Sequence, residues 1–270
     1  MVTIPRFGLL LCFALCGGAS LRGQDAVDDV ISLLLAEMTL EDKAGQMTLL
    51  ALGTTARAPS SGTTDFDPVL LREAILDRRV GAVFNAAGEA LAASRWADLV
   101  TRVQDLATQE SRHKIPVLVG VDAAHGASFL REATLFPHNL GLAATRNPGL
   151  VRRCHAITAN ELRSVGIPWA MGPMLDVGRQ PLWPRFCETF GEDVLLTSTL
   201  GTAALAGLQG QDLREPVRVV ASAKHFLGYG YPLSGRDGTQ SLLPERYLRE
   251  YFLPPYQEAM ARSGLRMVVA

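Results

Sequence analysis

Short apolar segments that alternate with helical segments are the feature that most limits the fold of this chain. Apolar runs occur at 80–84, 115–121, 167–171, 217–223 (interrupted by Arg218) and 265–270. Between them, residues with helical spacing occupy 96–106, 147–162, 193–209 and 245–262. Strands that are apolar throughout and separated by helices are typical of a parallel sheet with both faces covered. We therefore predict an α/β fold.

The segment before the first of these runs has a different pattern. Apolar side chains at 27–38 recur at helical spacing, and Thr39 is a candidate N-cap for a second short helix that extends to Met47. Residues 53–67 are rich in Gly, Thr, Ser, Pro and Asp, which predicts a loop.

Two architectures fit an alternating pattern of this kind, an open doubly wound sheet and a closed barrel of eight strand–helix units. No glycine-rich phosphate turn follows the first strand, which weighs against the dinucleotide-binding form of the open sheet. A complete barrel takes about 250 residues, whereas this chain reaches only about five units. The prediction is therefore an incomplete (β/α)8 TIM-barrel-like domain over residues 23–270.

Polar residues stand just after the predicted strands. Asp122 follows the second strand, Asp176 the third, and Lys224 and His225 the fourth. The active sites of barrels lie at the C-terminal ends of their strands. These residues are therefore the first candidates for a functional site.

The adjacent pair Lys224 and His225 is ambiguous by itself. Neighbouring residues of a strand point to opposite faces, so the backbone must bend if both are to serve one site. One interpretation is that they donate hydrogen bonds to a neutral polar ligand; the other is a lysine at the rim and a buried structural histidine. Neither residue alone decides between these.

Two further polar residues favour a binding site. Asp122 carries a carboxylate, which has only acceptors and suits two neighbouring hydroxyl groups, although it is equally compatible with a helix cap. Arg185 lies between Trp183 and Phe186, where its planar group of donors has aromatic rings beside it, although a salt bridge with Glu188 or Glu192 is the alternative. In a barrel these groups would converge on one pocket.

With these residues in place, the chain resembles glycoside hydrolase family 3, in its β-glucosidase and exo-β-glucanase branch. Six segments carry the resemblance in family order: 38–47 (MTLEDKAGQM), 120–126 (GVDAAHG), 135–146 (LFPHNLGLAATR), 172–177 (GPMLDV), 185–193 (RFCETFGED) and 223–230 (AKHFLGYG). The resemblance implies the N-terminal barrel domain of that family and hydrolysis of terminal non-reducing β-D-glucosyl residues by a retaining mechanism.

The resemblance also assigns site residues. Matched position by position, Asp122, Arg185, Lys224 and His225 would bind the non-reducing glucose. The family's nucleophilic aspartate and its acid/base glutamate would lie beyond residue 270, so we expect this chain to be an inactive fragment. Asp176 matches a position without a catalytic role, and we interpret it as structural.

Alternative functions exist within and outside this family. Family members that cleave N-acetylhexosaminides carry a histidine shortly after the Lys-His pair, and no histidine follows His225 here. A β-xylosidase is a further alternative within the family. Outside it are an aldolase with Lys224 as a Schiff-base nucleophile and a non-catalytic carbohydrate-binding protein.

Residues 1–22 predict export. Arg6 precedes a short apolar run at 7–15, and small residues follow at 17–20, which is the pattern of a secretory signal peptide. The run is too short for a membrane span of about 20 residues. Cys16 in this segment is also a weaker candidate for lipidation. We expect a periplasmic or extracellular protein, where Cys154 and Cys187 either pair or remain free thiols.

Composition excludes several classes of partner. The hydrophobic fraction is 48%, the charged fraction 20% and the net charge −1, which suits a globular protein and argues against nucleic acid as a partner. The five histidines lack the spacing of a metal site, so neither a metal nor any other cofactor is expected. The expected partner is a β-glucoside or an oligosaccharide.

Overall fold

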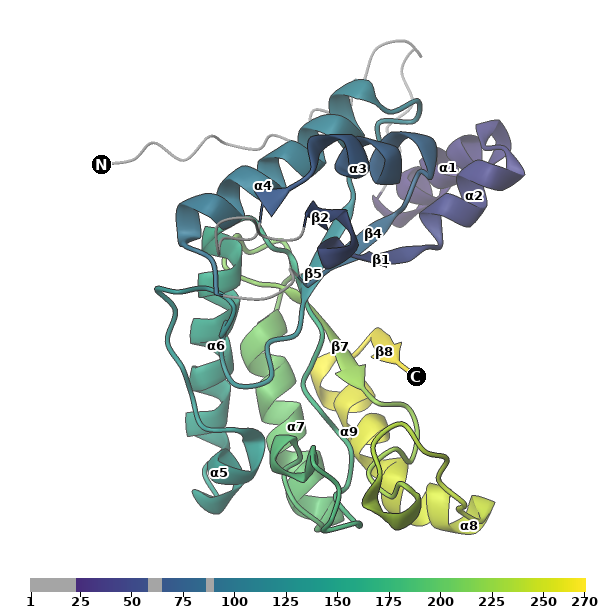
Figure 1. Ribbon diagram of the computed structural model, residues 1–270. Helices are drawn as coiled ribbons and strands as arrows, with labels where there is room; N and C mark the ends of the chain where they lie inside the picture. The colour runs from purple at the N-terminus through teal and green to yellow at the C-terminus, as the bar shows by residue number, and fades with distance from the viewer. Residues whose placement is uncertain (1–22, 58–64, 86–89) are drawn as a thin grey trace. The chain divides into compact units, whose positions relative to one another are not determined.

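The computed structural model describes residues 23–57, 65–85 and 90–270 (Figure 1). The predicted signal peptide at 1–22 lies outside this part. The chain divides into two compact units, Met1–Thr39 and Leu40–Ala270. In the first unit, helix α1 (Gly23–Glu37) confirms the helix predicted from the apolar spacing, and its apolar residues Val27, Ile31 and Leu35 are exposed.

Six strands of the second unit form one parallel sheet. They are β1 (Leu49–Ala51), β4 (Ala82–Phe84), β5 (Leu118–Val121), β6 (Trp169–Ala170), β7 (Val220–Lys224) and β8 (Met267–Val269). Their order in the sheet follows their order in the chain, and each pairs with the next in parallel. A doubly wound sheet reverses its strand order at a switch point, whereas a barrel does not. The sheet is therefore part of a barrel, and it is incomplete, as predicted.

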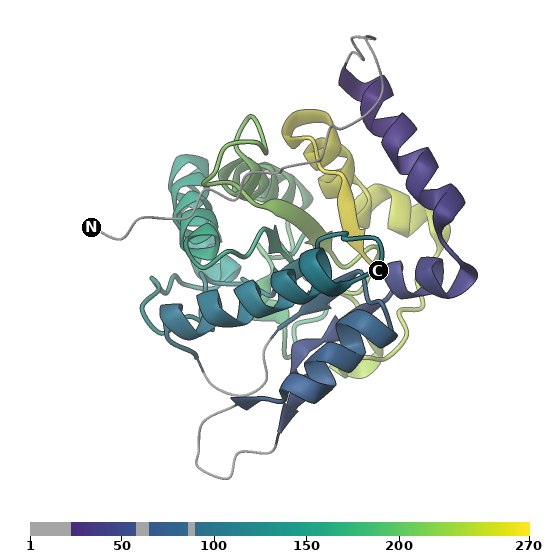
Figure 2. The same ribbon diagram turned by 90° about the horizontal axis from the view of Figure 1, so that it is seen from above.

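Helices cover the outside of this curled sheet (Figure 2). The helices of this unit are α2 (Leu40–Gln46), α3 (Pro68–Arg72), α4 (Ala93–Asp105), α5 (Asn139–Ala144), α6 (Pro148–Ser164), α7 (Val194–Gln209), α8 (Glu245–Tyr247) and α9 (Pro254–Ser263). Single π-helical turns extend three of them: η2 (Glu73–Asp77) after α3, η3 (Leu106–Glu110) after α4 and η6 (Leu248–Phe252) after α8. Across the described ranges, no helix has both the length and the apolar character that crossing a bilayer requires.

Capping residues fix where two of the long helices begin. The side chain of Asn147 accepts a hydrogen bond from the Leu150 N–H at 3.0 Å, as predicted from the Asn-Pro sequence at the start of α6. Asp193 accepts from the Leu196 N–H at 2.6 Å at the start of α7. The predicted helix over 245–262 is divided near Pro254, because proline has no N–H to continue the preceding helical turn.

The sequence interpretation was wrong in one stretch and incomplete in another. Residues 53–67 are not simply a loop: they include the end of a 3-10 turn, η1 (Leu52–Thr55), and two short antiparallel strands, β2 (Ala56–Arg57) and β3 (Asp65–Phe66). Strand β1 was not predicted, so the sheet has one strand more than the five expected. Three residues so soon after α2 carry no local signal for a strand, and only their pairing with β4 defines β1.

The core lies between the sheet and the helices. Val83, Val119 and Ala221 of the strands are buried, as are Trp96 of α4 and Leu162 of α6. Close packing explains one glycine: a Cβ on Gly120 would lie 2.3 Å from the ring of Trp169 on the neighbouring strand. The absence of a side chain on Gly120 therefore leaves space for the Trp169 ring.

Cys154 and Cys187 are both free, with Cys154 buried and Cys187 exposed. Of the two alternatives left open by the sequence, the structure supports the unpaired thiols. Burial raises the pKa of the Cys154 thiol, which further lowers its reactivity.

We expect iodoacetamide to modify Cys187 in the native protein and Cys154 only after unfolding, because a buried thiol of raised pKa is neither accessible nor a thiolate. Peptide mass spectrometry before and after denaturation measures this. A disulfide-linked pair of peptides containing both cysteines, or equal native modification of both, would contradict the assignment.

Candidate functional site at the C-terminal ends of the strands

The four candidate residues meet at one end of the sheet. Asp122 directly follows β5, Lys224 is the last residue of β7, and His225 comes next. Arg185 reaches the same place from the loop between β6 and α7, immediately before the 3-10 turn η4 (Phe186–Glu188). The regular strand ends at Lys224, so His225 lies outside it. The strand alternation that would place the two side chains on opposite faces therefore does not extend to His225.

Lys224 and Asp122 form an ion pair at the centre of the site. The Lys224 Nζ donates to Asp122 Oδ1, and the lysine side chain is only 7% exposed. Asn85, directly after β4, donates from Nδ2 to Asp122 Oδ2 at 2.7 Å and accepts from the Asp122 backbone N–H at 2.8 Å. The ends of β4, β5 and β7 thus contribute one hydrogen-bonded row, which passes over the end of β6.

This row keeps Asp122 ionised. Burial alone would raise the pKa of this carboxyl, but the ammonium of Lys224 and the hydrogen bonds from Lys224 and Asn85 outweigh it, so the pKa lies below its ordinary value. A carboxylate in this state accepts hydrogen bonds and does not supply a proton at neutral pH.

Arg185 forms a second, two-point ion pair with Glu188. Its Nε lies 2.9 Å from Glu188 Oε1 and its Nη2 lies 2.8 Å from Glu188 Oε2. Burial would raise the pKa of Glu188, but the Arg185 hydrogen bonds and charge lower it overall. The salt bridge that the sequence offered as an alternative role for Arg185 therefore exists, with Glu188 as its partner. It leaves Nη1 directed at His225 Nε2, 3.3 Å away.

The ring of His225 is held from both sides. Its Nδ1 lies 2.9 Å from Asp176 Oδ2, and the same oxygen accepts from the His225 backbone N–H at 2.9 Å. A guanidinium has no acceptor and a carboxylate has no proton to give. These partners assign the hydrogen to Nδ1 and make Nε2 an acceptor, a tautomer inferred from the network.

Aromatic side chains complete the wall of the site. Tyr229 lies edge-on to His225, with ring centroids 4.7 Å apart, and edge-on to Trp183 at 5.1 Å. Its hydroxyl donates to Asp237 Oδ1 at 2.7 Å, and the Trp183 indole donates to the same oxygen at 2.8 Å. Two distant loops are therefore fastened together beside the ion pairs.

A hollow of about 520 Å³ opens in front of these groups. Arg185, His225, Phe226 and Tyr229 line it, together with 239–241 and Ala270. Ligand pockets commonly have volumes of about 300–1,000 Å³. The hollow therefore has room for a small ligand beside Arg185 and His225.

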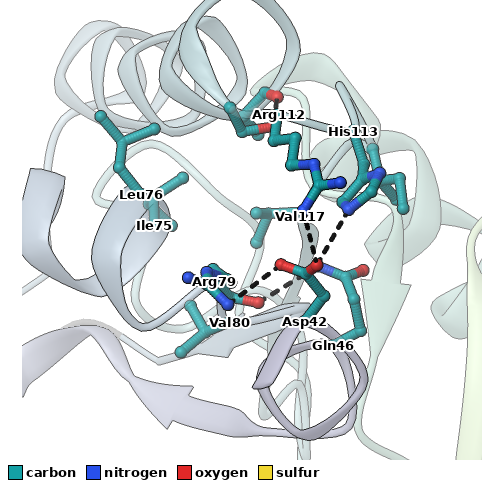
Figure 3. A pocket seen from close by; sticks show the side chains of 12 residues that line it. Asp42, Gln46, Ile75, Leu76, Arg79, Val80, Arg112, His113 and Val117 are labelled. Atoms are coloured by element: carbon teal, nitrogen blue, oxygen red, sulfur yellow. Dashed lines mark hydrogen bonds and ion pairs between the residues drawn. The ribbon is translucent and has the colours of Figure 1, made fainter. Parts of the chain in front are cut away.

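A second, smaller cavity of about 200 Å³ lies at the other ends of the strands (Figure 3). Its lining includes Gln46, Val80 and Val117, which precede β1, β4 and β5. Asp42 also lines this cavity and is only 3% exposed. Its carboxylate is paired with Arg79, Arg112 and His113. Since barrels carry stability rather than catalysis at this face, we assign this cluster a structural role.

The described residues contain no group of three or more His, Cys, Asp or Glu side chains arranged to hold a metal. The aldolase alternative gains no support either. A Schiff-base lysine must present a free amine, whereas the Lys224 Nζ is engaged with Asp122.

Sequence reasoning missed Asn85 and the contact between Asp176 and His225. Asn85 stands directly after Phe84, so the rule that selected Asp122 and Lys224 as polar residues after strands also applies to it. Its backbone has a positive φ of 43°, a conformation that asparagine tolerates better than most residues. Asp176 was interpreted as structural, and in the structure it holds a proposed ligand-binding residue.

Comparison with known proteins agrees with this geometry. The family model described as the Glycosyl hydrolase family 3 N terminal domain matches residues 39–270. The lysosomal beta glucosidase of Dictyostelium discoideum is 38% identical over an alignment of 252 residues, which covers 88% of this chain and 30% of that protein. The periplasmic beta-glucosidase of Salmonella typhimurium is 33% identical over 90% of this chain and 29% of its own length.

A solved structure gives the same result in three dimensions. The exo-1,3/1,4-beta-glucanase from a Pseudoalteromonas species superposes with a TM-score of 0.77 at 29% identity, covering 92% of this chain and 30% of that one. The chain thus spans about 30% of the length of these proteins.

Proposed function

This chain belongs to glycosyl hydrolase family 3, and from that premise we propose that it forms the sugar-binding part of an enzyme that hydrolyses terminal non-reducing β-D-glucosyl residues of β-glucosides or β-glucan oligosaccharides. The observation that carries the proposal is that Arg185 and His225 line one hollow, while the Asp122–Lys224 ion pair lies at the same ends of the strands. The similarity to beta-glucosidases supports the substrate class.

The charges of the site suit a neutral ligand. Asp122 is paired with Lys224 and Glu188 with Arg185, so neither pair leaves a net charge to attract an ion. Lysine and arginine offer donors, whereas the carboxylates and His225 Nε2 offer acceptors. A sugar hydroxyl both donates and accepts, so adjacent hydroxyl groups can bind to such an alternating row. The ring of Tyr229 adds an apolar surface beside it.

We assign none of the three carboxylates in this site the catalytic roles. A retaining glycosidase needs one carboxylate as nucleophile and a carboxylic acid of raised pKa as proton donor, about 5–5.5 Å apart. The pKa values of Asp122 and Glu188 are lowered, and Asp176 is engaged with His225. We propose that the two catalytic groups are not among these 270 residues. The hydroxyl contacts would then act by strengthening in the oxocarbenium-like transition state.

We also propose that residues 1–22 direct export and that residues 23–270 belong to the barrel domain. The similarity to the periplasmic beta-glucosidase of Salmonella typhimurium supports export. N-terminal sequencing of the secreted protein tests the position of cleavage.

The chain is expected to bind glucose without cleaving p-nitrophenyl β-glucoside, because none of the carboxylates in the proposed site is assigned the role of proton donor. Binding is measured by titration of amide NMR signals, with xylose and N-acetylglucosamine as competitors that represent the alternative substrates. Hydrolysis is followed by release of nitrophenolate.

Two outcomes would contradict the proposal. Turnover that persists after rigorous purification and disappears in a Lys224→Met variant would show that the chemistry is present. Absence of any sugar binding would remove the binding function itself.

A further inference from the structure

Asp176 is a buried carboxylate whose hydrogen bonds serve one residue. Its side chain is fully buried, and Oδ2 receives both the backbone N–H and the ring Nδ1 of His225, each at 2.9 Å. Its other oxygen, Oδ1, is buried without a hydrogen-bond partner within the described part of the chain. Leaving a buried acceptor unsatisfied costs about 1–3 kcal/mol. A carboxylate that served only to hold the fold together would be expected to use both oxygens.

We propose that Asp176 is a positioning residue for the sugar site, which holds the His225 ring with its hydrogen on Nδ1 and presents Nε2 to the hollow as an acceptor. This inference rests on the proposed function, since it gives His225 its part in sugar binding. His225 lines the hollow and its side chain is 16% exposed, whereas Asp176 lies behind it and does not line the hollow. Asp176 therefore acts through His225.

The direction of each hydrogen bond supports this assignment. Arg185 Nη1 lies 3.3 Å from His225 Nε2 and has only hydrogens to offer. If the hydrogen moved to Nε2, the ring and the guanidinium would present donors to each other. Asp176 prevents this because its Oδ2 lies 2.9 Å from Nδ1 and accepts the hydrogen there. A carboxylate that fixes a histidine tautomer in this way is a general device of active sites.

A consequence follows for the bound sugar. When a sugar binds, one of its hydroxyl groups takes the place of Arg185 Nη1 and donates to His225 Nε2, while Lys224 and the released Arg185 Nη1 donate to hydroxyl oxygens. The site then offers both acceptors and donors to a ligand whose hydroxyl groups need both. Loss of Asp176 would reverse the role of His225 and leave two neighbouring donors without an acceptor between them.

The test is an Asp176→Asn variant, which keeps size and shape but places an amide beside Nδ1. Long-range ¹⁵N–¹H NMR correlations report the tautomer of His225, with its signals assigned by their loss in His225→Ala. We expect the Nδ1–H form in the wild type, a shift toward the Nε2–H form in Asp176→Asn, and glucose affinity reduced about tenfold or more. In a His225→Ala background, Asp176→Asn should weaken glucose binding no further.

Asp42→Asn is the matched control, because Asp42 is also a buried carboxylate but lies at the opposite ends of the strands. It should change neither the tautomer nor the glucose affinity. An Nε2–H tautomer in the wild type would overturn the inference even if Asp176→Asn fails to fold. An unchanged tautomer and affinity in Asp176→Asn, or a full additional loss in the His225→Ala background, would also overturn it. Failure of the wild type to bind glucose would instead refute the proposed function and leave the tautomer measurement valid.

Discussion

A Lys224→Met variant will bind glucose about 30-fold more weakly than the wild type, or not measurably, because hydrogen bonds to charged groups contribute about 1.5–3 kcal/mol each and 1.4 kcal/mol is a factor of about ten. Methionine fills a similar volume in this buried position, so the fold should persist. It removes the ammonium that orients Asp122 and that we propose donates to the ligand. NMR titration with glucose measures the loss.

Lys114→Met is the control for this variant. Lys114 is exposed and precedes β5, whereas Asp122 follows it, so the two lie at opposite ends of the same strand. The control should bind glucose as the wild type does. If Lys224→Met keeps wild-type affinity while its spectrum remains that of a folded protein, Lys224 is not part of a sugar site.

An Asp42→Ala variant is expected to lose about 2–4 kcal/mol of unfolding free energy, because removing one partner of a buried ion pair leaves the others unsatisfied. Asp42 Oδ1 lies 3.1 Å from Arg79 Nη1, and Oδ2 lies 3.1 Å from His113 Nε2 and 3.6 Å from Arg112 Nη1 (Figure 3). The His113 side chain is only 11% exposed and cannot turn to water as the arginines can. Urea unfolding followed by circular dichroism measures the change.

Arg112→Ala is the comparison from the same cluster. Its side chain is 65% exposed, and exposed ion pairs contribute at most about 1 kcal/mol. It should therefore be close to the wild type in stability, and neither variant should alter glucose affinity under conditions where it is folded. If both substitutions lowered the free energy of unfolding by the same amount, Asp42 would not be the residue that stabilises this end of the sheet.

The class of fold was predictable because the strands are apolar on both faces. Runs such as 115–121 and 217–223 bury side chains against helices on one side and in the barrel interior on the other. Such strands are recognisable in the sequence as continuous apolar segments. The position of the site followed from the same pattern, since Asp122 and Lys224 break it where the strands end. Asn147 marked the start of α6 because its cap is a local interaction.

What remained hidden depends on contacts between distant residues. Strand β1 is recognisable only through its pairing with β4. Asn85 gains its role from two hydrogen bonds to Asp122, 37 residues away. Asp176 lies six positions beyond the end of β6, and nothing local indicates that it meets His225, 49 residues further along the chain.

The most direct test is a crystal structure of this chain soaked with glucose. We predict one glucose in the hollow, with hydroxyl groups within about 3.2 Å of polar atoms of Asp122, Lys224 and His225 and of the Arg185 guanidinium. Glucose bound only elsewhere, or an unoccupied hollow at a saturating concentration in crystals whose packing leaves it open, would contradict the assignment of these four residues as the sugar site.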